Sequence, residues 1–204
     1  MTSINWDKAA LVIVDPLVDL LSPESVIWDI IGSHVTEIDL ANKLKRLING
    51  AQNAGIPVMY SRVEITDEEY DAMSCKSGLQ SLMADRRMCV PGKGGRYHPD
   101  FEPAGGIIEL SARKGPSAVH SDFALQMRRR GLDTAVFAGM VANLCVESHV
   151  RDAVEAGFGA YVVSDAIGAI SAESLEATLA NFALHATGTL TTDEFLGSIT
   201  PVTA

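Results

Sequence analysis

Apolar residues gather in short runs along the chain, and their alternation with longer amphipathic stretches predicts the fold. The first run, Ala9 to Val14, contains no polar residue and ends at Asp15. A continuous apolar run of this length is typical of a parallel strand that is buried on both faces. Four later segments predict further strands at residues 56–61, 106–111, 134–138 and 160–164, and a sixth strand is expected at 187–191, where Leu190 is the one large apolar residue.

Helical spacing of apolar residues fills most of the intervals between these runs. One helix is expected from about residue 38 to residue 51, and others at about 122–130, 143–157, 173–185 and near 197. Residues 67–103 show no sustained period, and they predict one or two short helices with a long loop over the active-site edge. The alternation implies an α/β fold, with a doubly wound, mostly parallel six-stranded sheet and helices on both faces (a Rossmann-like three-layer sandwich). We expect one domain over residues 1–204.

Composition narrows the classes of partner. The chain carries a net charge of -10 at pH 7, so its surface is expected to repel nucleic acid and anionic membranes. The N-terminal residues do not form a signal-peptide pattern, and the three cysteines lack metal-ligand spacing. We therefore expect a cytoplasmic protein with free thiols and a small-molecule substrate, and neither a nucleic-acid partner nor a membrane partner.

Three reactive side chains follow separate predicted strands. Asp15, Lys114 and Cys145 lie at or just beyond the carboxyl ends of strands, where doubly wound sheets bind their ligands. Asn143 is a plausible N-cap, which places Cys145 in the first turn of a helix, where the dipole favours the thiolate. The ammonium of Lys114 would add to this effect, and Asp15 could carry the thiol proton to a leaving amine. The alternative is that Cys145 is only a small buried hydrophobe.

Four segments in order carry a resemblance to a known family. They are ALVIVDPLVDLLSPE (10–24), ARKGPSAVHSD (112–122), GMVANLCVESHVRDA (139–153) and VVSDAIGA (162–169). Together they resemble the first strand, the lysine segment, the nucleophile turn and the fifth strand of the isochorismatase-like cysteine hydrolases. The third segment is the most specific of the four.

The resemblance implies a catalytic triad of Asp15, Lys114 and Cys145. It also implies a non-proline cis peptide between Val141 and Ala142, and an oxyanion hole formed by the N–H groups of Ala142 and Cys145. The implied activity is hydrolysis of small amides or ureides through a thioester, with no metal or other cofactor. Relatives commonly associate, so a homodimer or homotetramer is expected.

Departures from the family pattern bear on the alternatives. Leu17 stands where many relatives carry glutamine, and no Asp-x-His sequence follows the first strand. The second absence disfavours a metal and nicotinamidase activity. Cys145 argues against the vinyl-ether hydrolysis of isochorismate, because members with that activity lack the cysteine. A catalytically idle binding or assembly module is the non-enzymatic alternative.

The remaining candidates are histidines and residues of the loops. His149 lies one helical turn after Cys145 and is an alternative base, although no partner that would orient it is evident. His34 is expected at the surface. Substrate contacts are assigned to residues in the loops after the strands: Trp28, Arg62, Tyr97 and His120.

Overall fold

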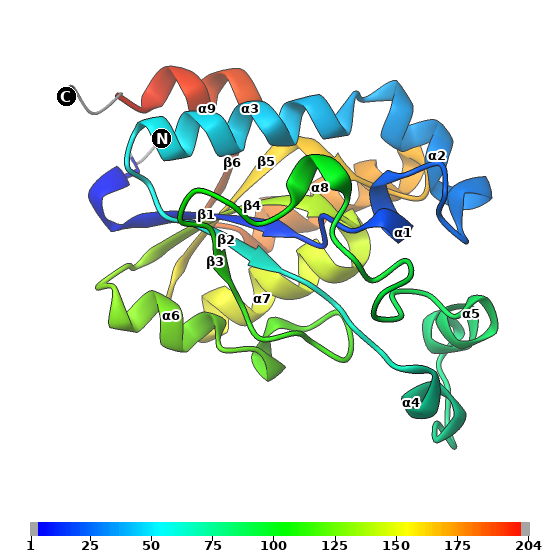
Figure 1. Ribbon diagram of the computed structural model, residues 1–204. Coiled ribbons are helices and arrows are strands. Elements are labelled where there is room, and N and C mark those ends of the chain that lie inside the picture. Colours follow the sequence, from blue (N-terminus) through cyan, green and yellow to red (C-terminus); the bar gives the residue numbers. More distant parts are fainter. Residues whose placement is uncertain (1–3, 201–204) are drawn as a thin grey trace.

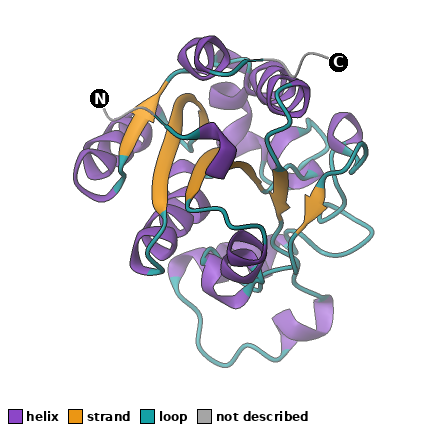
Figure 2. Cartoon of the chain, turned by 90° about the vertical axis from the view of Figure 1, so that its left-hand side faces the viewer, coloured by secondary structure: helices purple, strands orange, loops and turns teal. Residues whose placement is uncertain are grey.

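Six parallel strands form the central sheet of the computed structural model, which describes residues 4–200 (Figures 1 and 2). The strand order is β3-β2-β1-β4-β5-β6, so the order reverses between β1 and β4. This reversal makes the carboxyl ends of β1 and β4 the expected place for a ligand. The predicted fold class is confirmed. The strands are β1 (Ala9–Val14), β2 (Val58–Ser61), β3 (Ile108–Glu109), β4 (Thr134–Met140), β5 (Gly159–Gly168) and β6 (Gly188–Leu190).

Helices cover both faces of the sheet. One buried apolar cluster joins the sheet to α2 (Trp28–Glu37), α3 (Leu40–Asn53) and α9 (Thr192–Ser198). A second cluster joins the opposite face to α6 (Phe123–Arg129), α7 (Glu147–Glu155) and α8 (Ala172–His185). Figure 1 shows α3 and α9 above the sheet, and α6 and α7 below it. Within residues 4–200, no helix is both long enough and apolar enough to cross a bilayer.

Strand β1 shows why the apolar run predicts a buried strand. Leu11 and Ile13 belong to the cluster under α2, α3 and α9, whereas Ala10, Val12 and Val14 belong to the cluster on the other face. Successive side chains of a strand point to opposite faces, so a strand covered on both sides needs an apolar residue at every position. The bounds predicted for β1 are those of the structure.

Two short helices stand apart from the sheet. The helices α4 (Asp67–Asp71) and α5 (Gly78–Arg86) lie at the lower right of Figure 1, as expected for an irregular region with one or two short helices. Each begins with a capping box, formed by Thr66 with Glu69 and by Ser77 with Gln80. These reciprocal bonds satisfy N–H groups at each helix start and fix where both helices begin.

Several predicted bounds are wrong for identifiable reasons. The edge strand β3 has only two residues where six were predicted, and α2 begins at Trp28, which was expected to lie in a loop after the first strand. No side chain caps α2, because its N-cap residue is Ile27, so the sequence carries no start signal there. Strand β4 continues to Met140, two residues beyond the predicted end, and β5 reaches Gly168 past a shift in its register with β4.

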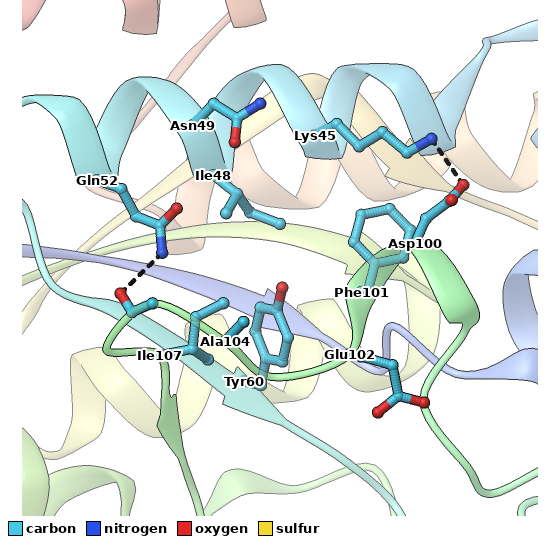
Figure 3. Close-up of a pocket in the computed structure, with 11 residues that line it drawn as sticks. Lys45, Ile48, Asn49, Gln52, Tyr60, Asp100, Phe101, Glu102, Ala104 and Ile107 are labelled. Atoms are coloured by element: carbon cyan, nitrogen blue, oxygen red, sulfur yellow. Dashed lines mark hydrogen bonds and ion pairs between the residues drawn. The ribbon is translucent and has the colours of Figure 1, made fainter.

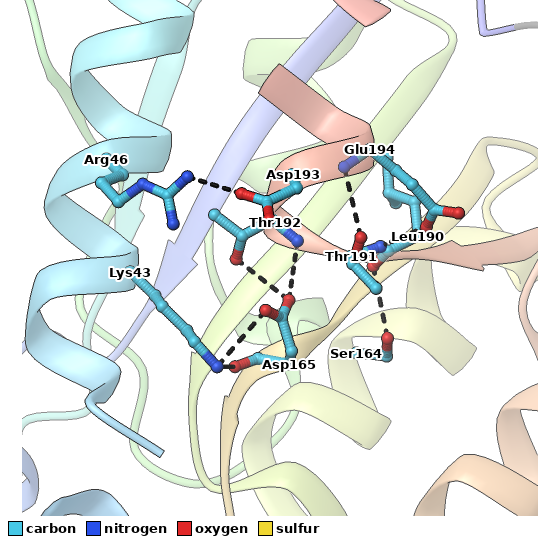
Figure 4. A network of polar contacts seen from close by, with 9 residues as sticks. All are labelled: Lys43, Arg46, Ser164, Asp165, Leu190, Thr191, Thr192, Asp193 and Glu194. Carbon is cyan, nitrogen blue, oxygen red and sulfur yellow. Dashed lines mark hydrogen bonds and ion pairs between the residues drawn. The ribbon is translucent and has the colours of Figure 1, made fainter. Parts of the chain in front are cut away.

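A polar network locks α9 and α3 against β5 (Figure 4). The Asp165 carboxylate accepts hydrogen bonds from Thr192 N at 2.7 Å and from Thr192 Oγ1 at 2.9 Å. Lys43 Nζ lies 3.3 Å from Asp165 Oδ2 and donates to the Asp165 carbonyl at 2.9 Å. Asp165 therefore serves the packing of these three elements, and its carboxylate oxygens are engaged away from Cys145.

Gly139 allows the ends of β1 and β4 to approach each other. Its φ is 116°, and a Cβ there would lie 2.2 Å from the carbonyl oxygen of Val14. Gly139→Ala is expected to lower the free energy of unfolding by roughly 2–4 kcal/mol, because backbone strain and a backbone clash add. Urea denaturation followed by circular dichroism measures the loss.

Gly197→Ala is the matched control. Gly197 lies in α9, is exposed and has no atom near the position of a new Cβ. Alanine there is expected to raise the free energy of unfolding by about 0.5–1 kcal/mol, because alanine favours the helix more than glycine does. Equal stability of Gly139→Ala and the unmodified chain would show that the close approach is unimportant.

Candidate active site

Asp15 lies at the reversal point of the sheet, directly after β1. The residue is fully buried and has a positive φ of 51°, an uncommon conformation that turns the chain sharply at the strand end. Its Oδ1 accepts hydrogen bonds from Val63 N at 2.6 Å and from Arg113 Nη2 at 2.5 Å. Its Oδ2 is buried and has no hydrogen-bond partner. The carboxylate therefore has one oxygen held by the protein and one oxygen left open.

Arg113 is the cation beside Asp15, and it is also fully buried. Its Nη1 donates to the carbonyls of Gly115 and Pro116 at 2.7 and 3.1 Å, and its Nε donates to Ser61 Oγ at 3.0 Å. Burial works against the charged guanidinium, but the Asp15 carboxylate and the Cys145 sulfur together outweigh it and raise the pKa of Arg113. A planar donor with five N–H groups suits this set of acceptors.

The prediction that Lys114 is the active-site cation is wrong. Lys114 is exposed, and its Nζ forms an ion pair with Glu69 Oε2 at 2.8 Å. Arg113 pairs with the backbone beside β2, since its N–H donates to Arg62 O and its carbonyl accepts from Glu64 N. Neighbouring side chains of an extended segment point in opposite directions, so an error of one residue exchanges the inside for the outside.

Cys145 lies in a π-helical turn, Ala142–Val146, that leads from β4 into α7. Burial raises the pKa of its thiol to about 12, the charge of Asp15 acts in the same direction, and Arg113 opposes both. The expected thiolate is therefore not the resting form, because the loss of solvent and the charge of Asp15 outweigh the effect of Arg113. Asn143 does not cap this turn: the N-cap residue is Val141, and Asn143 Oδ1 is buried without a hydrogen-bond partner.

His149 is a link in the buried network. Its Nδ1 lies 2.6 Å from the carbonyl oxygen of Cys145, and its Nε2 lies 2.8 Å from Ser61 Oγ. A carbonyl only accepts, so Nδ1 carries the proton, Ser61 donates to Nε2, and Arg113 Nε donates to Ser61. Complete burial lowers the pKa of His149 well below its usual value, and the charge of Arg113 adds to this effect. The imidazole is neutral and has both nitrogens engaged.

The turn after β4 contains a cis peptide, one position earlier than predicted. The bond lies between Met140 and Val141, and not between Val141 and Ala142. No proline marks a cis bond in this turn, so the family pattern alone gave its position, and that position is wrong by one residue. Ala142, proposed with Cys145 for the oxyanion hole, is buried in the same turn.

A small pocket opens directly at Cys145. Its walls come from α1 (Val18–Leu21), from α5 and from the segments after β2, β3 and β4. All of its lining residues are apolar or carry sulfur: Leu20, Val63, Leu79, Met83, Met88, Cys89, Gly115, Pro116, Val141, Leu144 and Cys145. Sequence reasoning missed this set, because isolated apolar residues give the same signal as the core.

None of the four residues predicted to contact the substrate lines this pocket. Trp28 packs over Gly32 in α2, and His120 is exposed in a 3-10 turn. Tyr97 Oη donates to Glu109 Oε2 at 3.0 Å. Arg62 stacks on the Tyr97 ring and pairs with Glu64. The structure therefore does not bring Trp28, Arg62, Tyr97 and His120 together at Cys145, since their side chains pack against or pair with other parts of the protein or face solvent.

A second pocket lies against α3, on the other face of the sheet (Figure 3). Its polar groups bind one another: Lys45 Nζ lies 2.6 Å from Asp100 Oδ2, and Gln52 Nε2 donates to Gly105 O at 3.1 Å. Tyr60 lines this pocket and belongs to the apolar cluster opposite that of Cys145. This pocket shares no lining residue with the pocket at Cys145.

The histidines do not gather into a metal site. Across the described residues, no group of three or more histidine, cysteine or acidic side chains is arranged to hold a metal ion. His34 is buried, contrary to the expectation of a surface residue, and its Nδ1 accepts a hydrogen bond from Ala169 N at 3.2 Å. It therefore joins α2 to the end of β5.

Three proteins of similar sequence align with about half or more of this chain. The uncharacterized isochorismatase family protein YecD of Escherichia coli is 30% identical over 174 residues, which cover 85% of this chain and 86% of that protein. The family member YwoC of Bacillus subtilis is 32% identical over 110 residues, which cover 54% of this chain and 58% of that protein. The ureidoacrylate amidohydrolase RutB of Variovorax paradoxus is 28% identical over 52% of this chain and 42% of its own length.

Solved structures share the fold at lower identity. A cysteine hydrolase from Pseudomonas syringae superposes with a TM-score of 0.82 at 20% identity, over 97% of this chain and 95% of its own. N-carbamoylsarcosine amidase from Thermoplasma acidophilum gives a TM-score of 0.68 at 21% identity, over 92% and 98% of the two chains. The isochorismatase domain model matches residues 9–194, and this chain belongs to that family of hydrolases.

Proposed function

We propose that the chain is a cysteine-dependent hydrolase of small amides or ureides that acts through Asp15, Arg113 and Cys145. The observation that carries the proposal is the open, buried Asp15 Oδ2 beside a thiol with a raised pKa. The thiol keeps its proton at neutral pH, and the carboxylate oxygen is free to take it. A nucleophile and its base are thus adjacent in a site from which water is largely excluded.

Acylation begins when Cys145 Sγ attacks the carbonyl carbon and its proton passes to Asp15 Oδ2. The carbonyl oxygen becomes an oxyanion, for which the N–H groups of Ala142 and Cys145 are the proposed donors. When this intermediate collapses, the C–N bond breaks, and Asp15 returns the proton to the departing nitrogen. The products are a free amine or ammonia and a thioester on Cys145.

Deacylation uses the same carboxylate a second time. A water oxygen attacks the thioester carbon while Asp15 accepts one of its protons. The C–S bond then breaks, the sulfur recovers the proton from Asp15, and the acid leaves. One base therefore serves both halves of the reaction.

Arg113 is proposed to position Asp15. Its guanidinium donates to Oδ1 and leaves Oδ2 without a hydrogen-bond partner. It stays charged at every working pH and opposes the effect of Asp15 on the thiol pKa. An arginine can do this in place of the family lysine, because Ser61 and the carbonyls of Gly115 and Pro116 occupy its other N–H groups.

The matched relatives support the reaction class. RutB and the Thermoplasma protein are named as an amidohydrolase and an amidase. Both names describe hydrolysis of amide-type bonds, for which a thiol nucleophile with a shared acid and base is suited.

Cys145→Ala tests the nucleophile. Ammonia or amine release from a panel of amides and ureides is expected to fall on the order of 10⁴-fold or more, because no attacking group remains. Cys75→Ala is the control, since Cys75 is exposed and is expected to leave turnover unchanged. Turnover by a folded Cys145→Ala protein at the unmodified rate would remove Cys145 from the mechanism.

Asp15→Asn tests the base, because it is expected to slow turnover and at the same time to make the Cys145 thiol easier to deprotonate. Turnover is expected to fall about 10²–10⁴-fold, because the proton acceptor is lost. The charge of Asp15 raises the thiol pKa, so its removal is expected to lower the pH at which Cys145 reacts with iodoacetamide. The pH profile of alkylation, read by peptide mass spectrometry, measures the shift.

Asp133→Asn is the control for this pair of readings, because Asp133 is exposed and precedes β4, whereas Cys145 lies in the turn after the other end of that strand. It is expected to change neither turnover nor the alkylation profile. An alkylation midpoint that stays in place or rises in Asp15→Asn would contradict the proposed contact between carboxylate and thiol.

A further inference from the structure

Two adjoining chambers lie beside Cys145. The inner chamber is the pocket described above, with a volume of about 40 Å³. The outer chamber has a volume of about 210 Å³ and extends under α4 and α5. Leu79, Met83, Gly115 and Pro116 line both chambers, so the two chambers share a wall. The residues that line only the outer chamber are Ile65, Tyr70, Met73, Ser77, Gln80 and Lys114.

The inner chamber offers no charge to a ligand. None of its lining residues is charged. Asp15 and Arg113, the nearest charges, already bind each other. Met83 and Met88 supply unbranched, adaptable thioether surfaces that fit flexible chains. An ionised group placed here would lose its water without gaining a partner.

The polar groups of the outer chamber are already engaged. Tyr70 Oη donates to the Met88 carbonyl at 2.7 Å, and the Lys114 ammonium pairs with Glu69. Ser77 and Gln80 bind each other in the capping box of α5. A ligand in this chamber therefore gains mainly from apolar contact with Leu79 and its neighbours.

We infer that the substrate is a short primary amide with a neutral, unbranched aliphatic acyl chain, and this rests on the proposed function. The chain would run from Cys145 past Leu79 and Met83 into the outer chamber. The small inner volume leaves little room for a leaving group larger than ammonia. The reaction is R–CO–NH₂ plus water giving R–COOH plus NH₃, in which a C–N bond breaks and a C–O bond forms.

A series of amides from acetamide to pentanamide tests the length of the chain. Each added methylene is expected to raise kcat/KM about fourfold, as burial of one such group predicts. Succinamate, which ends in a carboxylate where butyramide ends in a methyl group, is expected to react at least tenfold more slowly than butyramide. Release of ammonia is the measurement, with ureidopropionate and propylurea as further members of the panel.

Leu79→Lys tests whether the apolar wall at Leu79 disfavours charged substrates. Leu79 is only partly buried, so a lysine there can reach solvent without disrupting the core. The variant is expected to lower the ratio of kcat/KM for butyramide to kcat/KM for succinamate at least fivefold. Leu184→Lys, at an exposed position of α8, is expected to leave the preference unchanged. An unchanged preference in Leu79→Lys would overturn the assignment of this wall.

Covalent labelling separates the substrate class from the catalytic proposal. Iodoacetamide and iodoacetate are similar in size and differ in charge. The rate with iodoacetamide divided by the rate with iodoacetate is expected to be at least tenfold larger at Cys145 than at exposed Cys75. Leu79→Lys is expected to lower this ratio at Cys145. Equal ratios at both cysteines would overturn the neutral-substrate inference whether or not any amide is hydrolysed.

The outcomes of the amide panel are equally distinct. Faster hydrolysis of succinamate or ureidopropionate than of butyramide would overturn the substrate class and leave the cysteine hydrolase standing. Wild-type ammonia release in Cys145→Ala would instead overturn the catalytic proposal, and the substrate class with it.

Discussion

The buried ion pair of Asp15 and Arg113 is the interaction on which the candidate site depends. Both side chains are fully buried, and their nearest atoms lie 2.5 Å apart. Such a pair must recover its lost hydration through hydrogen bonds, and removal of one partner typically costs about 3–5 kcal/mol. Val63 N, Ser61 and two backbone carbonyls complete the bonding. The network joins the ends of β1 and β2 to the segment after β3, and it leaves one buried carboxylate oxygen without a hydrogen-bond partner.

Most of the fold can be predicted from the sequence, because a strand that is buried on both faces has an apolar residue at every position. In β1 every residue is apolar, so its bounds can be read from the chain, and the all-parallel order follows from alternation with helices. This apolar pattern is weaker at the edge of the sheet, where β3 has only two residues. The sequence carries no start signal for α2, because this helix begins after Ile27 with no capping side chain and is stabilised by tertiary contacts.

The site was only partly predictable, and the errors share a physical origin. Asp15 and Cys145 could be placed because each follows a strong central strand. Arg113 and Lys114 are adjacent cations in an extended segment, and only the fold decides which one points inward. Local reasoning also favoured a thiolate at Cys145, whereas burial, which no local pattern reveals, raises the pKa of the thiol. The apolar pocket walls were hidden because Leu79 and Met83 resemble core residues in sequence.

Trapping of the acyl-enzyme is the decisive measurement for catalysis through a thioester on Cys145. The protein is mixed with saturating pentanamide, quenched in acid within one turnover and analysed by peptide mass spectrometry. We expect a pentanoyl adduct on Cys145 that forms and decays at rates consistent with kcat, because the acid preserves a thioester. Turnover without an adduct on Cys145, or an adduct confined to another residue, would contradict catalysis through this thioester.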